Sequence, residues 1–254
     1  MPKTPPIKYI FFDIGNVLFN DERQNFLAYL RLHETIMSQG EDWSFSKLME
    51  IRESMVLRGQ QWINQKIAQT YLTEDVFQTY RKSLFTELLA AFDENHLFSP
   101  ATAEMLQSLQ KTYRLGIIAN QPPEARNSLQ RRGILDLFDV IAISDEVGIS
   151  KPDAGLYRWT LEQVDLPAEN CLMVGDRLDN DVAPAQEVGM QTVHLDWHIH
   201  TAPEWIVSTE NEIAYRSSTT RFPLFMNGRV NLTTPVTPTY TLPSLLDLPT
   251  ILPH

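Results

Sequence analysis

Five polar residues of the sequence stand where short apolar segments end. Asp13 and Asn120 directly follow such segments, Lys151 comes a few residues after a third, and Asp176 and Asp181 follow a fourth. Carboxylates that face one another suit Mg²⁺, which takes one or two protein carboxylates together with phosphate and water oxygens. A lysine beside them offsets charge on a bound anion and on an attacking carboxylate. This combination of residue types predicts phosphoryl transfer by positioning and charge neutralisation.

Each of these residues also has an ordinary structural explanation when taken alone. An aspartate at the end of a strand is often the N-cap of the next helix. A lysine that precedes a proline, as Lys151 precedes Pro152, is often just a solvated charge in a loop. The functional interpretation therefore depends on all five occurring at the ends of successive segments.

The apolar segments have the length and the β-branched or aromatic content of buried strands, and helical patterns separate them. Strands that alternate with helices of about 10–15 residues predict a parallel sheet with helices on both faces. Ligands bind such sheets beyond the carboxyl ends of the strands, where the five polar residues stand. The predicted strands are 7–13, 115–119, 140–143, 171–174 and 191–195, and the predicted helices are 99–112, 122–133, 153–164 and 182–188.

A helical segment interrupts this alternation between residues 21 and 98. Val76, Tyr80, Leu84 and Leu88 recur every four residues, which is the pattern of an amphipathic helix. The segment is long enough for three to five helices. We therefore expect an α/β protein in which an all-helical domain is inserted into a Rossmann-like core with a parallel sheet. The predicted core is 1–18 plus 99–254, and the predicted helical domain is 19–98.

The C-terminal part of the sequence shows weaker patterns. Residues 197–235 mix aromatic, Thr, Ser and Arg residues without clear periodicity, so we expect an irregular extension of the core there. The stretch 238–252 is expected to supply one more strand and a short helix.

Composition excludes several classes of protein. The 254 residues correspond to one large domain or to one domain with a substantial insertion, and 43% hydrophobic residues suffice for a core. The net charge of −11 gives no long-range attraction for nucleic acid or an anionic membrane. Cys171 is the single cysteine, and no apolar run has the length of a signal peptide or a membrane span. We expect a cytoplasmic protein, and its acidic charge does not exclude a small anionic substrate, because a site can be locally positive or hold a metal.

Four motifs in this order resemble those of the haloacid dehalogenase-like (HAD) hydrolase superfamily, in the branch with a helical cap after the first strand. The similarity extends over residues 8–195. The motifs are FFDIGNVL at 11–18, GIIAN at 116–120, GISKPD at 148–153 and VGDRLDND at 174–181. The resemblance implies a hydrolase with a cap domain that closes over its substrate and excludes water.

The same resemblance implies roles for the catalytic and metal-binding residues. Asp13 matches the catalytic nucleophile, which forms an aspartyl-phosphate. The backbone carbonyl of Gly15 and the carboxylates of Asp13 and Asp176 match the ligands of Mg²⁺, the implied cofactor. Asp181 matches an acid that supports this site, and Lys151 matches the lysine that steadies the nucleophile and the phosphoryl group.

Four positions are expected to bind the phosphoryl group of a small phosphorylated substrate. They are Gly15, Asn16, Asn120 and Lys151.

Two positions depart from the family pattern. The family usually has an aspartate as general acid and base where this chain has Gly15, and a Ser or Thr hydroxyl where it has Ala119. General acid–base help is worth roughly 10²–10⁴-fold in rate, and one preorganised hydrogen-bond donor roughly 10²–10³-fold. Asp21 and Glu22, just downstream, are candidates to replace the missing acid.

Three functions are compatible with these residues. The first is a Mg²⁺-dependent phosphatase of a small phosphorylated metabolite, weakened by Gly15 and Ala119. The second is a non-catalytic member of the superfamily that binds a ligand or a partner protein. The third is a 2-haloacid dehalogenase, which does not need the acid missing at Gly15, although Asp176 and Asp181 form an acidic motif of the metal-binding type.

Overall fold

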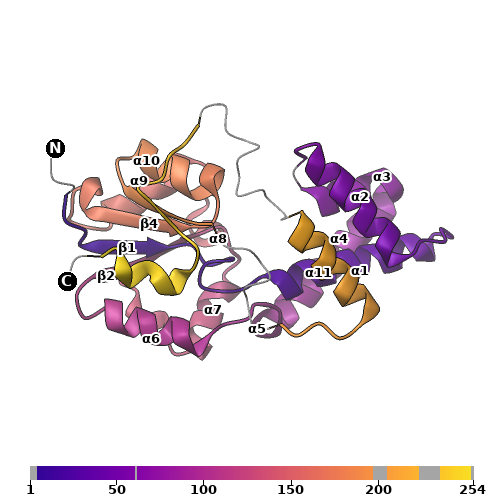
Figure 1. Cartoon of the computed structure of the whole chain (residues 1–254), viewed down its shortest axis with the longest axis horizontal. Coiled ribbons are helices and arrows are strands. Elements are labelled where there is room, and N and C mark those ends of the chain that lie inside the picture. Colours follow the sequence, from indigo (N-terminus) through magenta and orange to yellow (C-terminus); the bar gives the residue numbers. More distant parts are fainter. Residues whose placement is uncertain (1–4, 61, 197–204, 223–234, 253–254) are drawn as a thin grey trace. The chain divides into compact units, whose positions relative to one another are not determined.

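The computed structural model describes residues 5–60, 62–196, 205–222 and 235–252, which form two compact units (Figure 1). The core unit contains the described residues of 5–20, 98–196 and 235–252. The helical unit contains those of 21–97 and 205–222. The chain therefore enters the helical unit after residue 20 and is back in the core unit at residue 98, and it contributes a second segment, 205–222, to the helical unit.

A six-stranded parallel sheet is the centre of the core unit, which confirms the predicted fold class. Its spatial order is β3-β2-β1-β4-β5-β6, so β1 lies between β2 and β4 at the point where the winding direction reverses. Ligands of open α/β sheets bind at this switch point. The strands are β1 (Tyr9–Phe12), β2 (Arg114–Ala119), β3 (Val140–Ile143), β4 (Cys171–Gly175), β5 (Gln191–Leu195) and β6 (Tyr240–Leu242).

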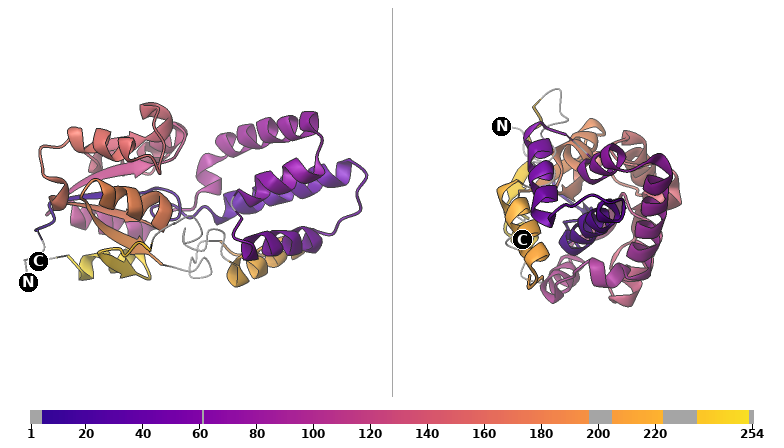
Figure 2. Two further views of the ribbon diagram at one scale, coloured as in Figure 1. Left: turned by 90° about the horizontal axis from the view of Figure 1, so that it is seen from above. Right: turned by 90° about the vertical axis from the view of Figure 1, so that its right-hand side faces the viewer.

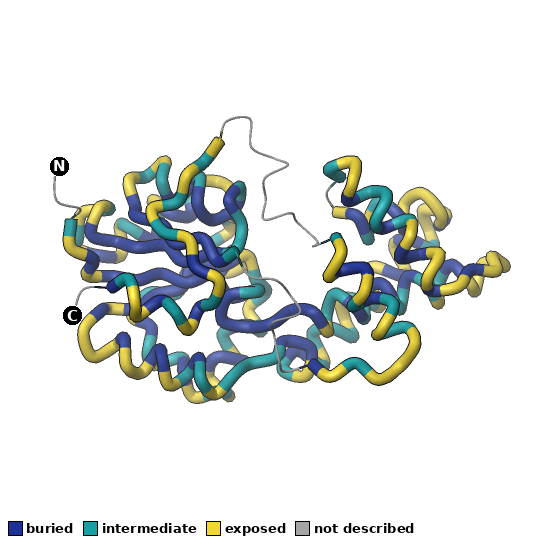
Figure 3. Tube along the Cα trace, in the orientation of Figure 1, coloured by how far each residue is buried: buried dark blue, intermediate teal, exposed yellow. Residues whose placement is uncertain are grey.

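Helices cover both faces of the sheet (Figure 1). On the face of α9 and α10, Tyr9 and Phe11 of β1 pack with Leu156 and Tyr157 of α9, all of them fully buried. The strands β1, β4 and β5 are buried along their whole length, and the middle of the core unit is correspondingly dark blue in Figure 3. The helices are α6 (Pro100–Leu109), α7 (Glu124–Arg131), α8 (Ser144–Val147), α9 (Ala154–Glu162) and α10 (Ala183–Glu187), with a π-helical turn at Leu178–Val182 and 3-10 turns at Leu135–Leu137, Ala168–Asn170 and Leu245–Thr250.

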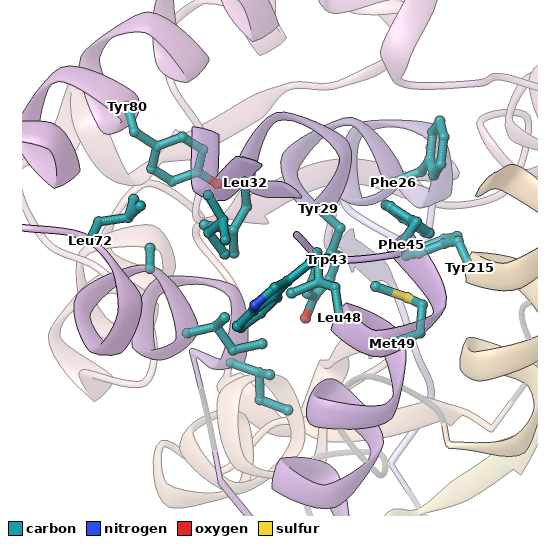
Figure 4. Packing of buried hydrophobic residues seen from close by; sticks show 14 of the residues in the cluster. Phe26, Tyr29, Leu32, Trp43, Phe45, Leu48, Met49, Leu72, Tyr80 and Tyr215 are labelled. Atoms are coloured by element: carbon teal, nitrogen blue, oxygen red, sulfur yellow. The ribbon is translucent and has the colours of Figure 1, made fainter. Parts of the chain in front are cut away.

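The helical unit packs around an aromatic and aliphatic core. Figure 4 shows Phe26, Phe45 and Tyr215 close together in its interior, with Trp43 further along the same cluster. Among the described residues, no helix combines the length and the apolar composition needed to cross a bilayer. The helices of this unit are α1 (Glu22–Ser38), α2 (Phe45–Leu57), α3 (Ile63–Tyr71), α4 (Glu74–Ala90), α5 (Phe92–Asn95) and α11 (Glu210–Arg221).

Helix α11 differs from the expectation for 197–235. We expected an irregular extension of the core there, but residues 210–221 form a helix that belongs to the helical unit. The start is a capping box, in which Thr209 and Glu212 each bond the backbone N–H of the other. The buried face contains Tyr215, Ser218 and Thr219, so it lacks the apolar periodicity by which a helix is usually recognised. Residues 197–204 and 223–234 lie outside the described residues.

A buried arginine fastens α11 to α2, which lies beside it (Figure 2). The Arg52 side chain is fully buried. Its guanidinium donates to the Ser218 hydroxyl at 3.0 Å and to the Phe222 carbonyl at 2.7 Å. The last carbonyls of a helix lack partners within the helix and carry its negative dipole end, so a cation there is favourable.

Replacing this arginine should destabilise the helical unit. Arg52→Leu leaves the Ser218 hydroxyl and a helix-end carbonyl without a donor, so we expect the free energy of unfolding to fall by about 3 kcal/mol. Urea denaturation followed by tryptophan fluorescence measures this, because Trp43 and Trp205 lie in the core of the unit.

The matched control is Arg221→Gln, which removes an arginine of α11 whose side chain is 61% exposed in its pair with Glu53. Exposed ion pairs contribute at most about 1 kcal/mol. Equal losses for the two variants would contradict the role given to Arg52.

Candidate active site at the carboxyl ends of the strands

Asp13 directly follows β1, and the backbone fixes its carboxylate. Its N–H donates to the Val174 carbonyl of β4 at 3.0 Å, which extends the pairing of β1 and β4 by one residue. The side chain is buried, and Oδ1 accepts the Ile14 N–H at 2.8 Å. Oδ1 also contacts the Nζ of Lys151 at 2.8 Å, whereas Oδ2 receives no hydrogen bond from the described residues. Oδ2 is thus the oxygen available to a ligand.

The loop after Asp13 is a tight turn built by one carbonyl. The Ile14 carbonyl accepts the N–H groups of Val17, Leu18 and Phe19 at 3.3, 2.9 and 2.9 Å. Asn16 has a φ of 54°, in the left-handed region that asparagine tolerates better than most residues. The turn holds Gly15 and Asn16 immediately beside the nucleophile position, as their place in the motif requires.

The ammonium of Lys151 is the most heavily bonded group of the site. It contacts Asp13 Oδ1 at 2.8 Å, Asp181 Oδ1 at 2.7 Å and the Ile118 carbonyl at 3.1 Å. An ammonium has three N–H donors, so the chain itself supplies an acceptor for each. Burial alone lowers the pKa of Lys151, but the two carboxylates raise it above its usual range, which keeps the lysine charged.

Asp181 is completely buried and accepts hydrogen bonds on both oxygens. Oδ1 takes the Lys151 ammonium, and Oδ2 accepts the backbone N–H of Arg177 at 3.0 Å. A Cβ at Gly175 would lie 2.3–2.6 Å from three atoms of this side chain. Glycine is therefore required at the end of β4 for Asp181 to reach the lysine. This geometry supports the prediction that Asp181 is a supporting residue.

Three carboxylates gather at this edge of the sheet. One oxygen from each of Asp13, Asp176 and Asp181 lies within 4.8 Å of the others. Burial, and then the charges of Asp181 and Asp13, raise the pKa of Asp176 well above its usual range. Burial raises the pKa of Asp13 to about 6, although the Lys151 charge opposes this shift. The excess negative charge is the environment that a divalent cation would neutralise.

Two residues that the sequence did not single out complete the site. The guanidinium of Arg177 holds both oxygens of Asp179, at 3.0 and 2.8 Å, in the turn before Asp181. The Tyr157 hydroxyl, fully buried on α9, donates to the Asn180 carbonyl at 3.0 Å. Both fix the turn that carries Asp181. Tyr157 lies within the predicted helix 153–164, but nothing in the sequence signals what its hydroxyl bonds.

Asn120 has a different place from the one expected. Its side-chain amide makes two hydrogen bonds with the backbone of Lys151. Nδ2 donates to the Lys151 carbonyl at 2.8 Å, and Oδ1 accepts the Lys151 N–H at 2.7 Å. Ala119, its neighbour in β2, is fully buried and offers no hydroxyl. Asp145 also follows a strand, but it is exposed in α8 and contacts the Ser144 hydroxyl at 3.3 Å.

Asp21 and Glu22, the two candidates to replace the acid missing at Gly15, belong to the helical unit. Glu22 is almost completely buried and pairs with Arg216 of α11 at 2.8 Å, so it is committed to packing within that unit. Asp21 is buried with its Oδ1 at 3.7 Å from Nε2 of His96, and burial raises its pKa to about 7.

Comparison with known proteins identifies related chains. A profile of the haloacid dehalogenase-like hydrolases matches residues 7–189. The pyrimidine 5'-nucleotidase YjjG of Escherichia coli is 27% identical over 219 residues, which cover 81% of this chain and 95% of that protein. A glyceraldehyde 3-phosphate phosphatase of Methanocaldococcus jannaschii is 27% identical over 195 residues, covering 74% of this chain and 85% of the relative.

Solved structures share the fold along nearly the whole chain. A HAD-hydrolase of Bacillus subtilis, YfnB, described as bound to magnesium, has a TM-score of 0.60 at 18% identity and covers 98% of this chain and 100% of its own. A protein of Haemophilus somnus described as a predicted phosphoglycolate phosphatase reaches 0.64 at 18% identity, covering 96% and 97%. A 2-haloacid dehalogenase of Pseudomonas syringae reaches 0.53 at 20% identity, covering 96% and 97%. At these identities the structures show a common fold.

The ion pairs of Lys151 predict a pH-dependent loss of stability in Lys151→Met. The Lys151 charge lowers the pKa of Asp13, so its removal raises that pKa further above the unfolded value. A carboxyl with a raised pKa in the folded state binds more protons than the unfolded chain does, so its contribution to stability falls as pH rises through that pKa. We expect a loss of about 3–5 kcal/mol at pH 8, where a buried carboxylate loses its partner, and a clearly smaller loss at pH 5.

Urea denaturation at both pH values measures this difference. Lys111→Met is the control, because Lys111 is exposed and its replacement should change stability little at either pH. Losses in Lys151→Met that are equal at pH 5 and pH 8 would show that packing, and not charge, determines the effect.

Proposed function

The chain belongs to the haloacid dehalogenase-like hydrolases, and on this premise we propose that it is a Mg²⁺-dependent phosphatase of a small phosphorylated metabolite, with Asp13 as nucleophile. The related nucleotidase and glyceraldehyde 3-phosphate phosphatase support a phosphorylated substrate. The observation that carries the proposal is the buried contact of Lys151 with both Asp13 and Asp181 beside the Asp176 carboxylate, at the switch point of the sheet.

The first step is the attack of Asp13 on phosphorus. With a pKa of about 6, its carboxyl is mostly ionised at pH 7 and is therefore a nucleophile. The contacts of Ile14 and Lys151 fall on Oδ1, which orients Oδ2 toward the ligand. A bond forms between Oδ2 and phosphorus while the bond from phosphorus to the leaving oxygen breaks. That oxygen takes a proton from solvent, since Gly15 has none to give.

The second step hydrolyses the aspartyl-phosphate. Water adds to phosphorus, the bond between phosphorus and Oδ2 breaks, and the proton lost by the water passes to solvent. Orthophosphate leaves, and the Asp13 carboxylate is restored beside the Lys151 ammonium. Because that ammonium is already in place, the returning charge is neutralised without rearrangement of the site.

The residues present fit a divalent metal ion. The three carboxylates face one lysine ammonium, and the guanidinium of Arg177 is engaged by Asp179, so the cluster retains excess negative charge. The carboxylates of Asp13 and Asp176 with the Gly15 carbonyl would hold Mg²⁺, a cation that prefers oxygen ligands, and Asp181 would support them. When bound, the ion supplies positive charge to the phosphoryl oxygens.

Gly15 and Ala119 motivate a second candidate, a protein that binds a phosphorylated ligand without hydrolysing it. Without a positioned acid, the leaving group must depart with little protonation, and without a hydroxyl at Ala119 the phosphoryl group has one donor fewer. A 2-haloacid dehalogenase ranks third, because the carboxylate of Asp176 beside Asp13 suits a cation better than it suits the departure of a halide.

Hydrolysis of p-nitrophenyl phosphate tests the proposal, since this leaving group needs little protonation. We expect release that depends on Mg²⁺ and that falls by roughly 10³-fold or more in Asp13→Asn. Asp145→Asn is the matched control, an aspartate that also follows a strand but is exposed and outside the cluster. It should keep wild-type turnover.

The other outcomes separate the candidates. If Mg²⁺ with tungstate raises the melting temperature of the wild type but p-nitrophenyl phosphate is not hydrolysed, the binding protein is favoured. Chloride release from a 2-haloacid without added metal favours the dehalogenase. Turnover that is unchanged in Asp13→Asn excludes the proposed nucleophile.

The missing acid predicts a gain of activity in Gly15→Asp. An acid at this position helps most when the leaving group is a poor one, so we expect turnover of an alkyl ester such as glycerol 3-phosphate to rise about 10-fold or more. Turnover of p-nitrophenyl phosphate should change by less than about 3-fold. Gly15 is not among the described residues with a positive φ, so an aspartate there does not require a left-handed backbone.

Gly15→Asn is the control for this gain, because asparagine has nearly the same shape and no acidic proton. The ratio of the two turnover rates, alkyl over aryl, should increase in Gly15→Asp alone. An equal increase in both variants would mean that the gain comes from packing and not from proton transfer.

A further inference from the structure

We propose that Asn120 is a positioning residue, which holds the backbone of Lys151 so that the ammonium meets Asp13. The effect that we expect on turnover rests on the proposed function. The structural basis of the inference is independent of that function, because it concerns how the chain places a charged group. The role differs from the phosphate contact that the sequence predicts for Asn120.

The backbone of Lys151 lies in a loop that regular structure does not fix. The residue stands between the end of α8 at Val147 and the start of α9 at Ala154. Among the described residues, neither its N–H nor its carbonyl takes part in a backbone–backbone hydrogen bond. The following residue, Pro152, has no N–H to donate. The position of this lysine backbone therefore depends on side chains.

Asn120 satisfies both backbone groups of Lys151 at once. Its Oδ1 accepts the N–H at 2.7 Å, and its Nδ2 donates to the carbonyl at 2.8 Å. Two parallel bonds from one planar amide fix orientation as well as distance. They join the residue that follows β2 to a loop 31 residues later in the sequence.

The end of β2 holds the lysine at two places. The Ile118 carbonyl accepts from the ammonium at 3.1 Å, and Asn120, two residues later, bonds the backbone. The side chain of Lys151 is thereby held at both ends, at its backbone by Asn120 and at its ammonium by the buried carboxylates of Asp13 and Asp181. A displacement of the anchor would be passed to the ammonium, and misplacement of about 1 Å at a catalytic group can cost about 10²-fold in rate.

The position of Asn120 makes the proposal testable without damage to the core. Asn120 is exposed, whereas the lysine that it bonds is buried. Asn120→Ala removes both hydrogen bonds, and because the residue is exposed it creates no cavity in the core. The matched control is Asn127→Ala on α7, an exposed asparagine whose amide donates to Glu124 at 2.9 Å and does not touch the site.

The first measurement is NMR of the lysine side-chain ammonium groups in ¹⁵N-labelled protein. A buried ammonium with three acceptors exchanges its protons slowly, so Lys151 should give an observable Nζ signal, assigned by its absence in Lys151→Met. We expect this signal to shift or to broaden beyond detection in Asn120→Ala and to stay unchanged in Asn127→Ala. A signal with the wild-type shift and exchange rate in Asn120→Ala overturns the proposal.

The second measurement is a double-mutant cycle in kcat/KM for p-nitrophenyl phosphate. Asn120→Ala should lower kcat about 10–100-fold with little change in KM, and it should have less than a 2-fold effect once Lys151→Ala is present. Equal effects in both backgrounds would show that Asn120 acts independently of the lysine, and the proposal would fail. If the wild type lacks turnover that depends on Asp13, the proposed function fails, and the NMR result alone decides the role of Asn120.

Discussion

A single buried ammonium, that of Lys151, joins parts of the core unit that are far apart in the sequence. It contacts Asp13 after β1, the Ile118 carbonyl in β2 and Asp181 after β4. Several other features exist because this contact must be made. Gly175 leaves room for the Asp181 side chain, and Tyr157, Arg177 and Asn120 fix the turn and the loop that bring the partners together. A buried charge without such partners would be strongly destabilising.

The sequence predicts the core unit well because its signals are local. Each apolar strand ends in a distinctive polar residue, and strand alternation with helices determines a parallel sheet whose carboxyl ends meet at one edge. That reasoning is sufficient to bring Asp13, Lys151, Asp176 and Asp181 to one place, where the structure has them. Strands β1 to β5 differ from the five predicted ranges by no more than two residues at either end, because their β-branched and aromatic runs have clear limits.

Other features depend on contacts that periodicity does not record. Helix α11 buries Tyr215, Ser218 and Thr219, and two of these three residues are polar and satisfied by neighbours, so the apolar pattern is missing. Its capping box is a readable signal, since Thr209 and Glu212 have the required spacing. The hydrogen bonds of Asn120 to Lys151 have no comparable signal, because an amide after a strand gives no indication of which backbone it will bond.

The assembly of the helical unit from two distant segments has a consequence for its biogenesis. Arg52 reaches hydrogen-bond partners 166 and 170 residues later in the chain. On a ribosome that adds about 5–20 residues per second, Arg52 has no α11 to bond for roughly 10–30 seconds. During that interval β2 to β5 are synthesised, while the guanidinium of Arg52 lacks its acceptors on and after α11. The core of the helical unit is therefore completed only when α11 has been synthesised, although the other helices of the unit are local and quick to form.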